Sequence, residues 1–370
     1  MITQFIISNG DKIPSPALIF NEQAIKSNIS KAIETAGGPT RLRPHVKTHK
    51  TREIVKMQQE SGISKFKCAT IAEAEMLGLC GAEDVLLAYP LVGPNVDRFI
   101  ELVKSFTETE FSVVAESRRG AELLSAAAAD SGVEIPVYLD LDPGLHRTGI
   151  EPGNSAIELY KYISKLPYLK AAGIHCYDGH IHQSELSVRA AAANECYQAS
   201  LSVQHKIEES GMKAENLVIG GTPAFQIYAQ FPDVQLSPGT CFLNDWDYAK
   251  NYKDMQFDFA AVVLTRVISV HPEQSCFTID TGCKAIASDP DSARGLILEL
   301  PDAQPLYQNE EHWVFKLITN ELPEEGQILH VLPTHICPTS ALYSQAHIIN
   351  SKGDWYTNWK IEARNRRLSI

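Results

Sequence analysis

Short runs of apolar residues alternate with helix-like stretches over the first two thirds of the chain. Helical spacing is present at 70–80, 118–132 and 184–210. Strands separated by helices are typical of parallel βα units. The apolar runs predict strands at 41–46, 65–69, 84–88, 111–115, 135–141, 170–176, 217–221 and 234–236. Eight such strands close a (β/α)8 barrel, so the sequence predicts an α/β fold with this barrel.

The pattern changes after about residue 245. The runs FDFAAVVLTRVISV, SCFTIDTG, GLILEL, HWVFKL, QILHVLP and QAHIIN are β-like and are divided by turn residues. Because helical periodicity is absent, we expect an all-β C-terminal domain, with which the N-terminal run QFIIS pairs. The predicted domains are a barrel over 14–243 and a β domain formed by 1–13 and 244–370.

Length, charge and cysteine usage narrow the class of protein. A chain of 370 residues is long enough for two domains. The net charge of −12 argues against a nucleic-acid partner. The start, MITQFIISNGDKIPSP, lacks the features of a signal peptide, and no run of about 18 apolar residues predicts a membrane helix. Eight cysteines without a CxxC pair suggest free thiols in a reducing cytoplasm.

The predicted strand ends carry residues that are capable of chemistry. In barrels of this type the reactive groups lie at the C-terminal ends of the strands. The first strand ends in PHVK, which contains Lys47, and Arg147 follows the fifth strand. Tyr177 and His180 follow the sixth strand. The ordinary interpretation of RLRPHVKTHK is a solvated basic strand end, and the alternative is that one lysine takes part in chemistry.

Two glycine-containing loops follow the last two predicted strands. The first is Gly220-Gly221-Thr222, and the second contains Gly239-Thr240. Glycines let backbone N–H groups approach phosphate oxygens, and the threonines add hydroxyl donors. Either loop alone is an ordinary turn, but these two strand ends are the usual phosphate site of such barrels. A phosphorylated ligand and a strand-end lysine in one site suggest pyridoxal 5'-phosphate (PLP) bound as a Schiff base.

Several stretches together resemble a known family. They are PSPALIF, RPHVKTHK, ATIAEAEMLGLCGAEDVLLAYP, LDLDPGLHRTGI, AGIHCYDGH, IGGTP, SPGTC, DTGCKA and PTHICPT. The chain is similar to the fold-type III PLP enzymes, which have an alanine racemase-like barrel, and within them to the D-threonine aldolase and D-serine dehydratase group. The resemblance implies a PLP-binding barrel followed by a β domain, and a homodimer by analogy.

The resemblance also implies roles for single residues. Lys47 matches the PLP-binding lysine, Arg147 matches the arginine that faces the phenolic oxygen of the cofactor, and Tyr177 lies beside the ring. The group that faces the pyridine nitrogen is left unassigned. Lys47, Tyr177 and His180 are the candidate catalytic residues. The expected cofactor-binding residues are Lys47, Arg147, Tyr177, Gly220, Gly221, Thr222, Gly239 and Thr240.

A second constellation is the pair His335 and Cys337 in PTHICPT. In an extended segment both side chains point to one face. Imidazole and thiolate suit Zn²⁺, although an isolated pair of this kind is more often a capping histidine and a buried cysteine. The resemblance implies a divalent metal here, with Zn²⁺ as first choice and Mn²⁺ as alternative. His180 and His182 form a rival pair with the same spacing.

Together these features predict a cytoplasmic lyase that acts on D-3-hydroxy amino acids. The resemblance implies that Lys47 forms a Schiff base and that the metal activates the β-hydroxyl of the substrate. The products are either glycine and an aldehyde, or ammonia and a keto acid. In the group, aldolases tend to pair the metal histidine with Asp and dehydratases with Cys, so Cys337 favours a dehydratase without deciding the reaction. The expected partner is a small amino acid substrate, with no nucleic acid and no membrane.

Three alternatives stay open. An amino acid racemase would need a second acid or base, usually a tyrosine from the partner subunit, and would not need the His335 and Cys337 pair. A non-catalytic PLP-binding protein would tend to lack the β domain. A barrel that binds another phosphorylated ligand would show no Schiff-base absorbance.

Overall fold

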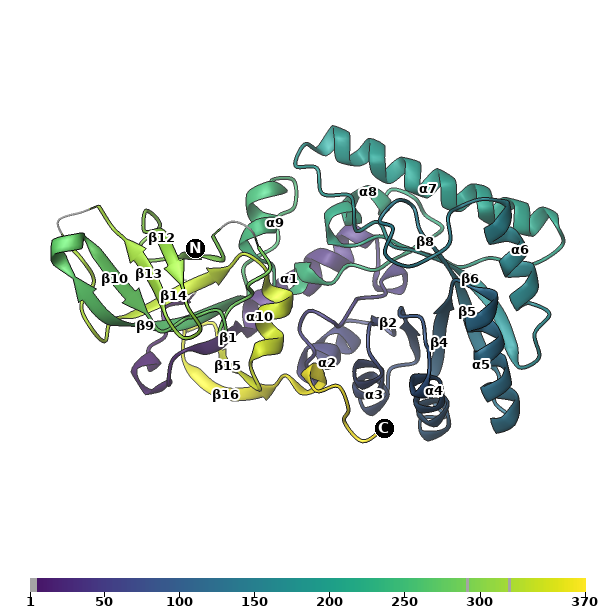
Figure 1. The fold of residues 1–370 in the computed structure, drawn as a ribbon, viewed down its shortest axis with the longest axis horizontal. Coiled ribbons are helices and arrows are strands. Elements are labelled where there is room, and N and C mark those ends of the chain that lie inside the picture. Colours follow the sequence, from purple (N-terminus) through teal and green to yellow (C-terminus); the bar gives the residue numbers. More distant parts are fainter. Residues whose placement is uncertain (1–4, 291–292, 319–320) are drawn as a thin grey trace. The chain divides into compact units, whose positions relative to one another are not determined.

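The computed structural model describes residues 5–290, 293–318 and 321–370 (Figure 1). The chain divides into two compact units that each combine distant segments of the sequence. The sheet unit comprises Met1–Lys31, Thr48–Ile54 and Thr240–Arg364, and the barrel unit comprises Ala32–Lys47, Val55–Gly239 and Asn365–Ile370. None of the helices in the described ranges has the length and apolar character needed to span a membrane.

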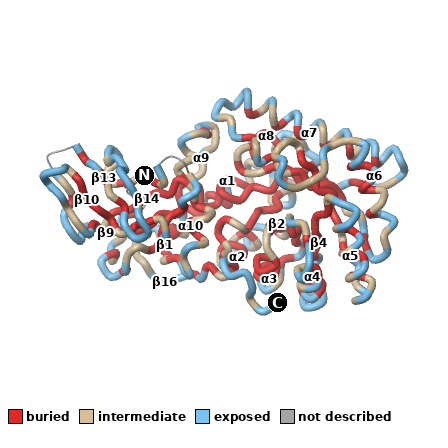
Figure 2. The backbone as a smooth tube through the Cα atoms, viewed as in Figure 1, coloured by how far each residue is buried: buried red, intermediate tan, exposed pale blue. Residues whose placement is uncertain are grey.

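The barrel unit is built on a parallel sheet of seven strands in the order β2-β3-β4-β5-β6-β7-β8. Neighbours in sequence are neighbours in the sheet, as expected for consecutive βα units. Their residues are buried on both faces, which explains the nearly continuous apolar runs (Figure 2). The strands are β2 (Lys65–Cys68), β3 (Asp84–Leu87), β4 (Glu110–Ala115), β5 (Ile135–Leu141), β6 (Leu169–Cys176), β7 (Leu217–Ile219) and β8 (Val234–Leu236).

Helices alternate with these strands and lie outside the sheet (Figure 1). The helix α3 begins after Thr70, whose hydroxyl accepts a hydrogen bond from the Glu73 amide at 3.1 Å. This is the N-cap contact that the sequence around residue 70 provides. The helices are α2 (Arg52–Glu60), α3 (Ile71–Leu79), α4 (Pro94–Ser105), α5 (Arg118–Ser131), α6 (Asn154–Ile163), α7 (Leu186–Glu209) and α8 (Phe225–Tyr228). The predicted α/β barrel is thereby confirmed.

The segment predicted as a strand at 41–46 has a different structure. It forms only two isolated parallel bridges, Leu42 with Leu236 of β8 and His45 with Lys67 of β2. The Val46 amide donates to the Lys67 carbonyl at 3.0 Å, and the Lys67 amide donates to the Pro44 carbonyl at 2.9 Å. Pro44 has no N–H, so a continuous ladder cannot form through it. The segment nevertheless connects the two edge strands and closes the barrel.

Arg43 fixes this closing segment in the barrel interior. Its side chain is fully buried. The guanidinium donates to both carboxylate oxygens of Asp84 at 2.6 and 2.5 Å, and its Nε donates to Gln235 at 2.8 Å. A paired arrangement of this kind compensates for the desolvation of the guanidinium.

The sheet unit contains a nine-stranded sheet with the path β12-β13-β10-β9-β1-β15-β16, in which β14 also pairs with β9 and with β11. All pairings are antiparallel except that of β1 with β15. The strands are β1 (Ala17–Asn21), β9 (Ala261–His271), β10 (Cys276–Ile279), β11 (Gly295–Ile297), β12 (Gln304–Gln308), β13 (Trp313–Lys316), β14 (Ile328–Pro333), β15 (Gln345–Ile349) and β16 (Trp355–Lys360). The helices α1 (Glu22–Ala36), α9 (Trp246–Asn251) and α10 (Ile336–Leu342) belong wholly or in part to this unit.

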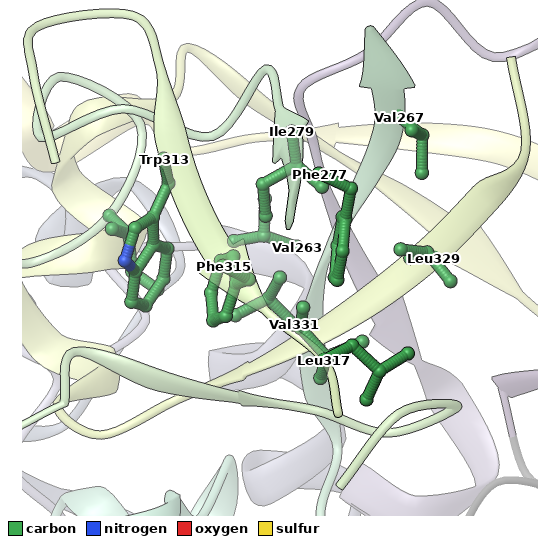
Figure 3. Close-up of a cluster of buried hydrophobic side chains, with 11 residues drawn as sticks. Val263, Val267, Phe277, Ile279, Trp313, Phe315, Leu317, Leu329 and Val331 are labelled. Carbon is green, nitrogen blue, oxygen red and sulfur yellow. The ribbon is translucent and has the colours of Figure 1, made fainter. Parts of the chain in front are cut away.

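A cluster of apolar side chains forms one core of the sheet unit. Phe277 and Phe315 stack with ring centroids 5.6 Å apart, and Trp313 packs against Phe315 at 4.6 Å (Figure 3). Val263 and Val331 from the adjacent strands β9 and β14 complete the cluster on one side. The cluster explains why the predicted β-like runs after residue 245 are rich in aromatic and β-branched residues.

The predicted boundaries at 14–243 and 244–370 stay a prediction, and the structure differs from them at one strand. β1 lies within the range predicted for the barrel, yet it pairs with β9 and β15. The run QFIIS lies partly outside the described residues. Its Phe5 is buried in a core cluster of the sheet unit, but residues 5–8 form no strand.

The Arg43 contact yields a prediction about stability. Asp84→Ala should lower the free energy of unfolding by about 3–5 kcal/mol, because it leaves a buried guanidinium without its carboxylate. Urea unfolding of Asp84→Ala measures the effect. Asp130→Ala, which removes an exposed aspartate on α5, is the control. Equal midpoints for the two variants would contradict the stabilising role of the pair.

Candidate functional site

Lys47 opens onto a pocket at the C-terminal ends of the barrel strands. Lys47 directly follows the segment that closes the barrel. The backbone N–H of Lys47 lies 3.4 Å from Nδ1 of His45 in that segment. The pocket receives side chains from the closing segment, from β2, β5 and β6, and from residues that follow β3, β5 and β6. Its lining is His45, Lys47, Lys67, Ala88, Asp140, Leu141, Leu145, Arg147, Thr148, His175 and Tyr177. The structure therefore brings together three residues that the sequence singled out: Lys47, Arg147 and Tyr177.

The Tyr177 ring is the common neighbour of three cationic side chains. The Nζ atoms of Lys47 and Lys67 lie 5.6 and 5.7 Å from its centroid, and Cζ of Arg147 lies 5.1 Å away. Such distances are typical of cation–π attraction, which partly offsets repulsion among the cations. The positive charge that these side chains carry around one ring also favours an anionic ligand.

The predicted phosphate loops of the barrel unit lie against each other. The Thr222 hydroxyl accepts a hydrogen bond from the Gly239 amide at 3.1 Å, and Ser237 donates to the Gly220 carbonyl at 3.1 Å. Gly220 has a φ of +80°, and a Cβ here would lie 2.6 Å from the Tyr228 ring. A Cβ on Gly221 would lie 3.2 Å from the Tyr177 ring. Gly220 thus needs to be glycine, whereas a Cβ at Gly221 would require a small shift of the Tyr177 ring. The Gly220 amide donates to the Cys176 carbonyl at 3.0 Å.

The loop that carries Arg147 is held by a buried carboxylate. Asp142 accepts hydrogen bonds from the backbone amides of Gly144 and His146, each at 3.0 Å. Burial raises the pKa of Asp142, but these amide donors outweigh it and hold the pKa below its usual value. The charged form of Asp142 therefore stabilises the conformation of the loop before Arg147.

Lys67, His175 and Asp140 form a polar chain from the pocket wall into the barrel. The Lys67 Nζ lies 3.4 Å from Nε2 of His175, and Nδ1 of His175 lies 2.7 Å from the Asp140 carboxylate. A carboxylate can only accept, so Nδ1 carries the imidazole proton and Nε2 accepts from Lys67. All three side chains are buried, and they come from three strands, β2, β5 and β6.

The electrostatic environment changes the acidity of this chain. Burial and the nearby Lys47 cation lower the pKa of Lys67 to about 7, against the opposing effect of Asp178 and Asp140. Burial also lowers the pKa of His175, although the Asp140 carboxylate opposes this. Lys67 is thus divided between its neutral and charged forms near neutral pH.

Sequence reasoning missed Lys67 and Asp140 as members of this site. Both lie inside strands that are otherwise apolar, in KFKC and IPVYLDL. Parallel strands buried on both faces are normally continuous apolar runs, so a charged residue within one is itself a signal. The prediction considered only residues at the strand ends and therefore passed over this signal.

His180 lies apart from the residues that line this pocket. Its Nε2 is 3.9 Å from the Cys196 sulfur and would lie 3.3 Å from a Cβ built on Gly144. Its assignment as a catalytic residue therefore stays a prediction without support from the pocket geometry. His182, the other member of the rival metal pair, is exposed in the same loop.

The sheet unit holds the second predicted constellation. His335 and Cys337 do not lie in an extended segment, since His335 is the N-cap of α10 and Cys337 is its second residue. The Asp245 carboxylate accepts from the Ile336 amide at 3.1 Å and also caps α9, which fixes the start of α10. The two side chains still interact. Burial lowers the pKa of His335, but the Cys337 thiolate and the Asp289 carboxylate outweigh it and raise the pKa to about 9.

The neighbours of this pair determine which of its atoms are available. Nδ1 of His335 lies 2.6 Å from the Asp289 carboxylate, so Nε2 is the ring nitrogen that contacts Cys337 and could bind a metal ion. The Cys337 sulfur lies 3.1 Å from the Thr48 hydroxyl and 3.4 Å from that of Thr240. Thr240, expected in the phosphate cradle, thus contacts the cysteine. Over the described ranges, no group of three His, Cys, Asp or Glu side chains is arranged to hold a metal ion.

The lowered pKa of Lys67 predicts a pH effect on stability. Between about pH 7 and pH 10 the unfolded chain carries a proton on this amine that the folded chain lacks, so folding gains stability as the pH rises. Lys67→Met removes this contribution, which amounts to about 1.4 kcal/mol per pH unit at most. Urea unfolding at pH 7, 8 and 9 should show a shallower rise for Lys67→Met than for wild type or Lys65→Met. If the free energy of unfolding rose equally with pH in all three proteins, the contribution of Lys67 would be refuted.

Comparison with known families covers both units. Residues 20–242 match the family "Alanine racemase, N-terminal domain". Residues 260–349 match the family "Putative serine dehydratase domain". The two matches follow each other without overlap, which agrees with a barrel followed by a β-rich part.

Whole-chain relatives are enzymes of closely related kinds. The D-threonine aldolase of Arthrobacter sp is 24% identical over 95% of this chain and 93% of its own. The D-serine dehydratase of Dictyostelium discoideum is 23% identical over 95% of this chain and 97% of its own. The crystal structure of D-threonine aldolase from Filomicrobium marinum superposes with a TM-score of 0.88, at 25% identity and with 96% of both chains covered. The chain belongs to the alanine racemase N-terminal domain family, in its group with D-threonine aldolase and D-serine dehydratase.

Proposed function

We propose that this chain is a lyase that uses PLP and a divalent metal ion to cleave D-3-hydroxy amino acids. The observation that carries the proposal is the pocket in which Lys47, Arg147 and Tyr177 converge at the strand ends of a barrel of this family. The substrate class follows from the whole-chain relatives, which are an aldolase and a dehydratase of D-amino acids.

The residues of the barrel unit fit PLP. Lys47 offers the amine for its aldehyde group, and Arg147 and Tyr177 surround the same space. The Thr222 hydroxyl accepts from the Gly239 amide and keeps its own proton to donate to the phosphate. Gly220 and Gly221 stay expected members of the phosphate cradle. Bound PLP would supply an electron sink for negative charge at Cα of the substrate.

The residues of the chain would then bind, orient and exchange protons. Arg147 holds an anionic oxygen through its fixed fork of donors, and the loop anchored by Asp142 positions it. The Tyr177 ring limits the orientation of a planar ligand by packing against it. Lys47 lines the same pocket, and its Nζ can take the proton from Cα.

The pair His335 and Cys337 fits a divalent metal with an open coordination position. An imidazole nitrogen oriented by Asp289 and a thiolate are ligands that Zn²⁺ prefers, and solvent and substrate would complete the shell. Bound metal would supply Lewis-acid activation of the substrate β-hydroxyl. Thr48 and Thr240, which contact Cys337, directly follow Lys47 and Gly239 in the sequence.

Two products are compatible with these residues. If a base removes the proton of the β-hydroxyl, the Cα–Cβ bond breaks and glycine and an aldehyde form. If Lys47 removes the Cα proton and the hydroxyl leaves, ammonia and a keto acid form. Cys337 favours the second outcome only through the preference of related dehydratases, so the reaction type stays open.

A racemase is the second candidate function, favoured by the family of the barrel. It would act without a metal and would release the L-isomer.

A cytoplasmic homodimer also remains part of the proposal. Size-exclusion chromatography with light scattering measures the oligomeric state.

Product analysis tests the proposed function. Purified protein with PLP and D-threonine or D-serine should release glycine and acetaldehyde, or ammonia and 2-oxobutyrate or pyruvate. EDTA should abolish either reaction, and Lys47→Ala should lower the rate at least about 10³-fold because it removes the amine that binds PLP and takes the proton. An L-isomer that forms equally with and without EDTA would replace the proposal by a racemase.

Substitution of Asp289 tests the metal pair. Asp289→Asn should weaken metal binding about 10- to 100-fold, because the carboxylate orients His335. Metal titration followed by mass spectrometry of the native protein measures the affinity, with Cys337→Ala as the variant that loses a ligand and Cys283→Ala as control. Unchanged affinity in both Asp289→Asn and Cys337→Ala would exclude this metal site.

A further inference from the structure

The barrel pocket contains two lysines, and the proposed function uses only one. Their Nζ atoms lie at nearly the same distance from the Tyr177 ring centroid, 5.6 Å for Lys47 and 5.7 Å for Lys67. A planar ligand that packs on Tyr177 is therefore within similar reach of both amines. Lys67 lies on β2, and its backbone is bound to the segment that carries Lys47 through Pro44 and Val46. The two amines are held in one fixed arrangement.

We propose that Lys67 is a second nucleophilic amine of this pocket, which condenses with aldehydes. Its surroundings are those that activate a nucleophile: an adjacent base, His175, which is oriented by a third group, Asp140. A desolvated amine next to another cationic group, here Lys47, is a recognised form of this activation. The inference rests on the proposed function only for the identity of the aldehyde.

The condensation step balances without an oxidant or reductant. The Nζ lone pair of Lys67 adds to the carbonyl carbon of the aldehyde, while a proton of Nζ moves to Nε2 of His175. This proton then returns to the oxygen of the adduct, which gives a carbinolamine. Nε2 of His175 passes the second proton of Nζ to the same oxygen, which leaves as water as the C=N bond forms. PLP and the aldehyde product of a retro-aldol cleavage are both members of the reactive class.

Charged groups on every neighbouring element influence the reactivity of Lys67. Those that act on Lys67 are Lys47, Arg43, Asp140 on β5 and Asp178 on the loop after β6. His175 on β6 lies beside the amine, and Arg147 on the loop after β5 acts on His175. The pKa of Lys67 is about 7 in this environment, with burial as its main cause. At pH 7 the neutral fraction of such an amine exceeds that of an ordinary lysine by about a thousandfold.

Reductive trapping tests the inference. Wild type, Lys47→Ala, Lys47→Ala with Lys67→Arg, and Lys47→Ala with Lys65→Arg are incubated with PLP and cyanoborohydride at pH 7. Peptide mass spectrometry then locates the phosphopyridoxyl group. We expect it on Lys47 in wild type and on Lys67 in Lys47→Ala, with at least about tenfold more than on any other lysine. The Lys65→Arg control should keep the Lys67 adduct, and Lys67→Arg should lose it.

Each outcome separates this inference from the proposed function. An adduct on Lys47 in wild type, with none on Lys67 in Lys47→Ala, overturns the inference and leaves the PLP role of Lys47 intact. An adduct on Lys67 already in wild type supports the inference but overturns the role of Lys47. Modification spread over surface lysines in every variant overturns both.

A second measurement avoids dependence on the folding of the variants. Wild-type protein treated with acetaldehyde and cyanoborohydride at pH 7 should be ethylated on Lys67 before its surface lysines. Lowering the pH to 5.5 should reduce the yield at Lys67 about tenfold or more, because the neutral amine is protonated. Yields at Lys67 equal to those of surface lysines at pH 7 would overturn the inference.

Discussion

The closure of the barrel by a short irregular segment is the constraint on which the barrel site depends. Residues 42–46 bridge β8 on one side and β2 on the other through a few backbone hydrogen bonds. The buried Arg43 side chain reinforces this bridge through Asp84 of β3 and Gln235 of β8. Lys47 follows directly, so its position is set by the same contacts that close the barrel. A proline within the segment prevents a regular ladder and makes these side-chain contacts more important.

Much of the fold could be predicted because the responsible signals are local. Apolar runs are read directly from the sequence, and they located β2 to β8 with errors of at most two residues at their ends. The pairing of β1 was not predictable in this way. β1 is followed by α1 like any strand of a βα unit, and only the long-range contacts with β9 and β15 show where it belongs. The short helices α9 and α10 were missed for a related reason, since six or seven residues give too few turns for a period to appear.

The candidate site shows the same division between local and long-range signals. Lys47, Arg147 and Tyr177 were found because they follow strands, where a barrel collects functional residues. Thr240 was grouped with the phosphate loops by the same rule and stays a prediction there, while its hydroxyl contacts Cys337. His335 and Cys337 were paired by a strand period that does not apply to them, because a helix begins between them. Their side chains interact all the same, since an extended N-cap residue can direct its side chain over the first turn of its helix.

The interior of the barrel illustrates how a functional site opposes stability. Lys67, Asp140 and His175 occupy positions on β2, β5 and β6 where apolar side chains would pack without any cost of desolvation. Their mutual hydrogen bonds satisfy two of the three groups well, whereas the contact at 3.4 Å leaves the lysine amine weakly held. The cost of desolvating the Lys67 amine appears as its lowered pKa, because burial disfavours the charged form of the amine. A ligand with negative charge, or one that reacts with the amine, relieves this cost when it binds. The same desolvation that destabilises the empty barrel therefore strengthens its affinity for ligands of that chemistry.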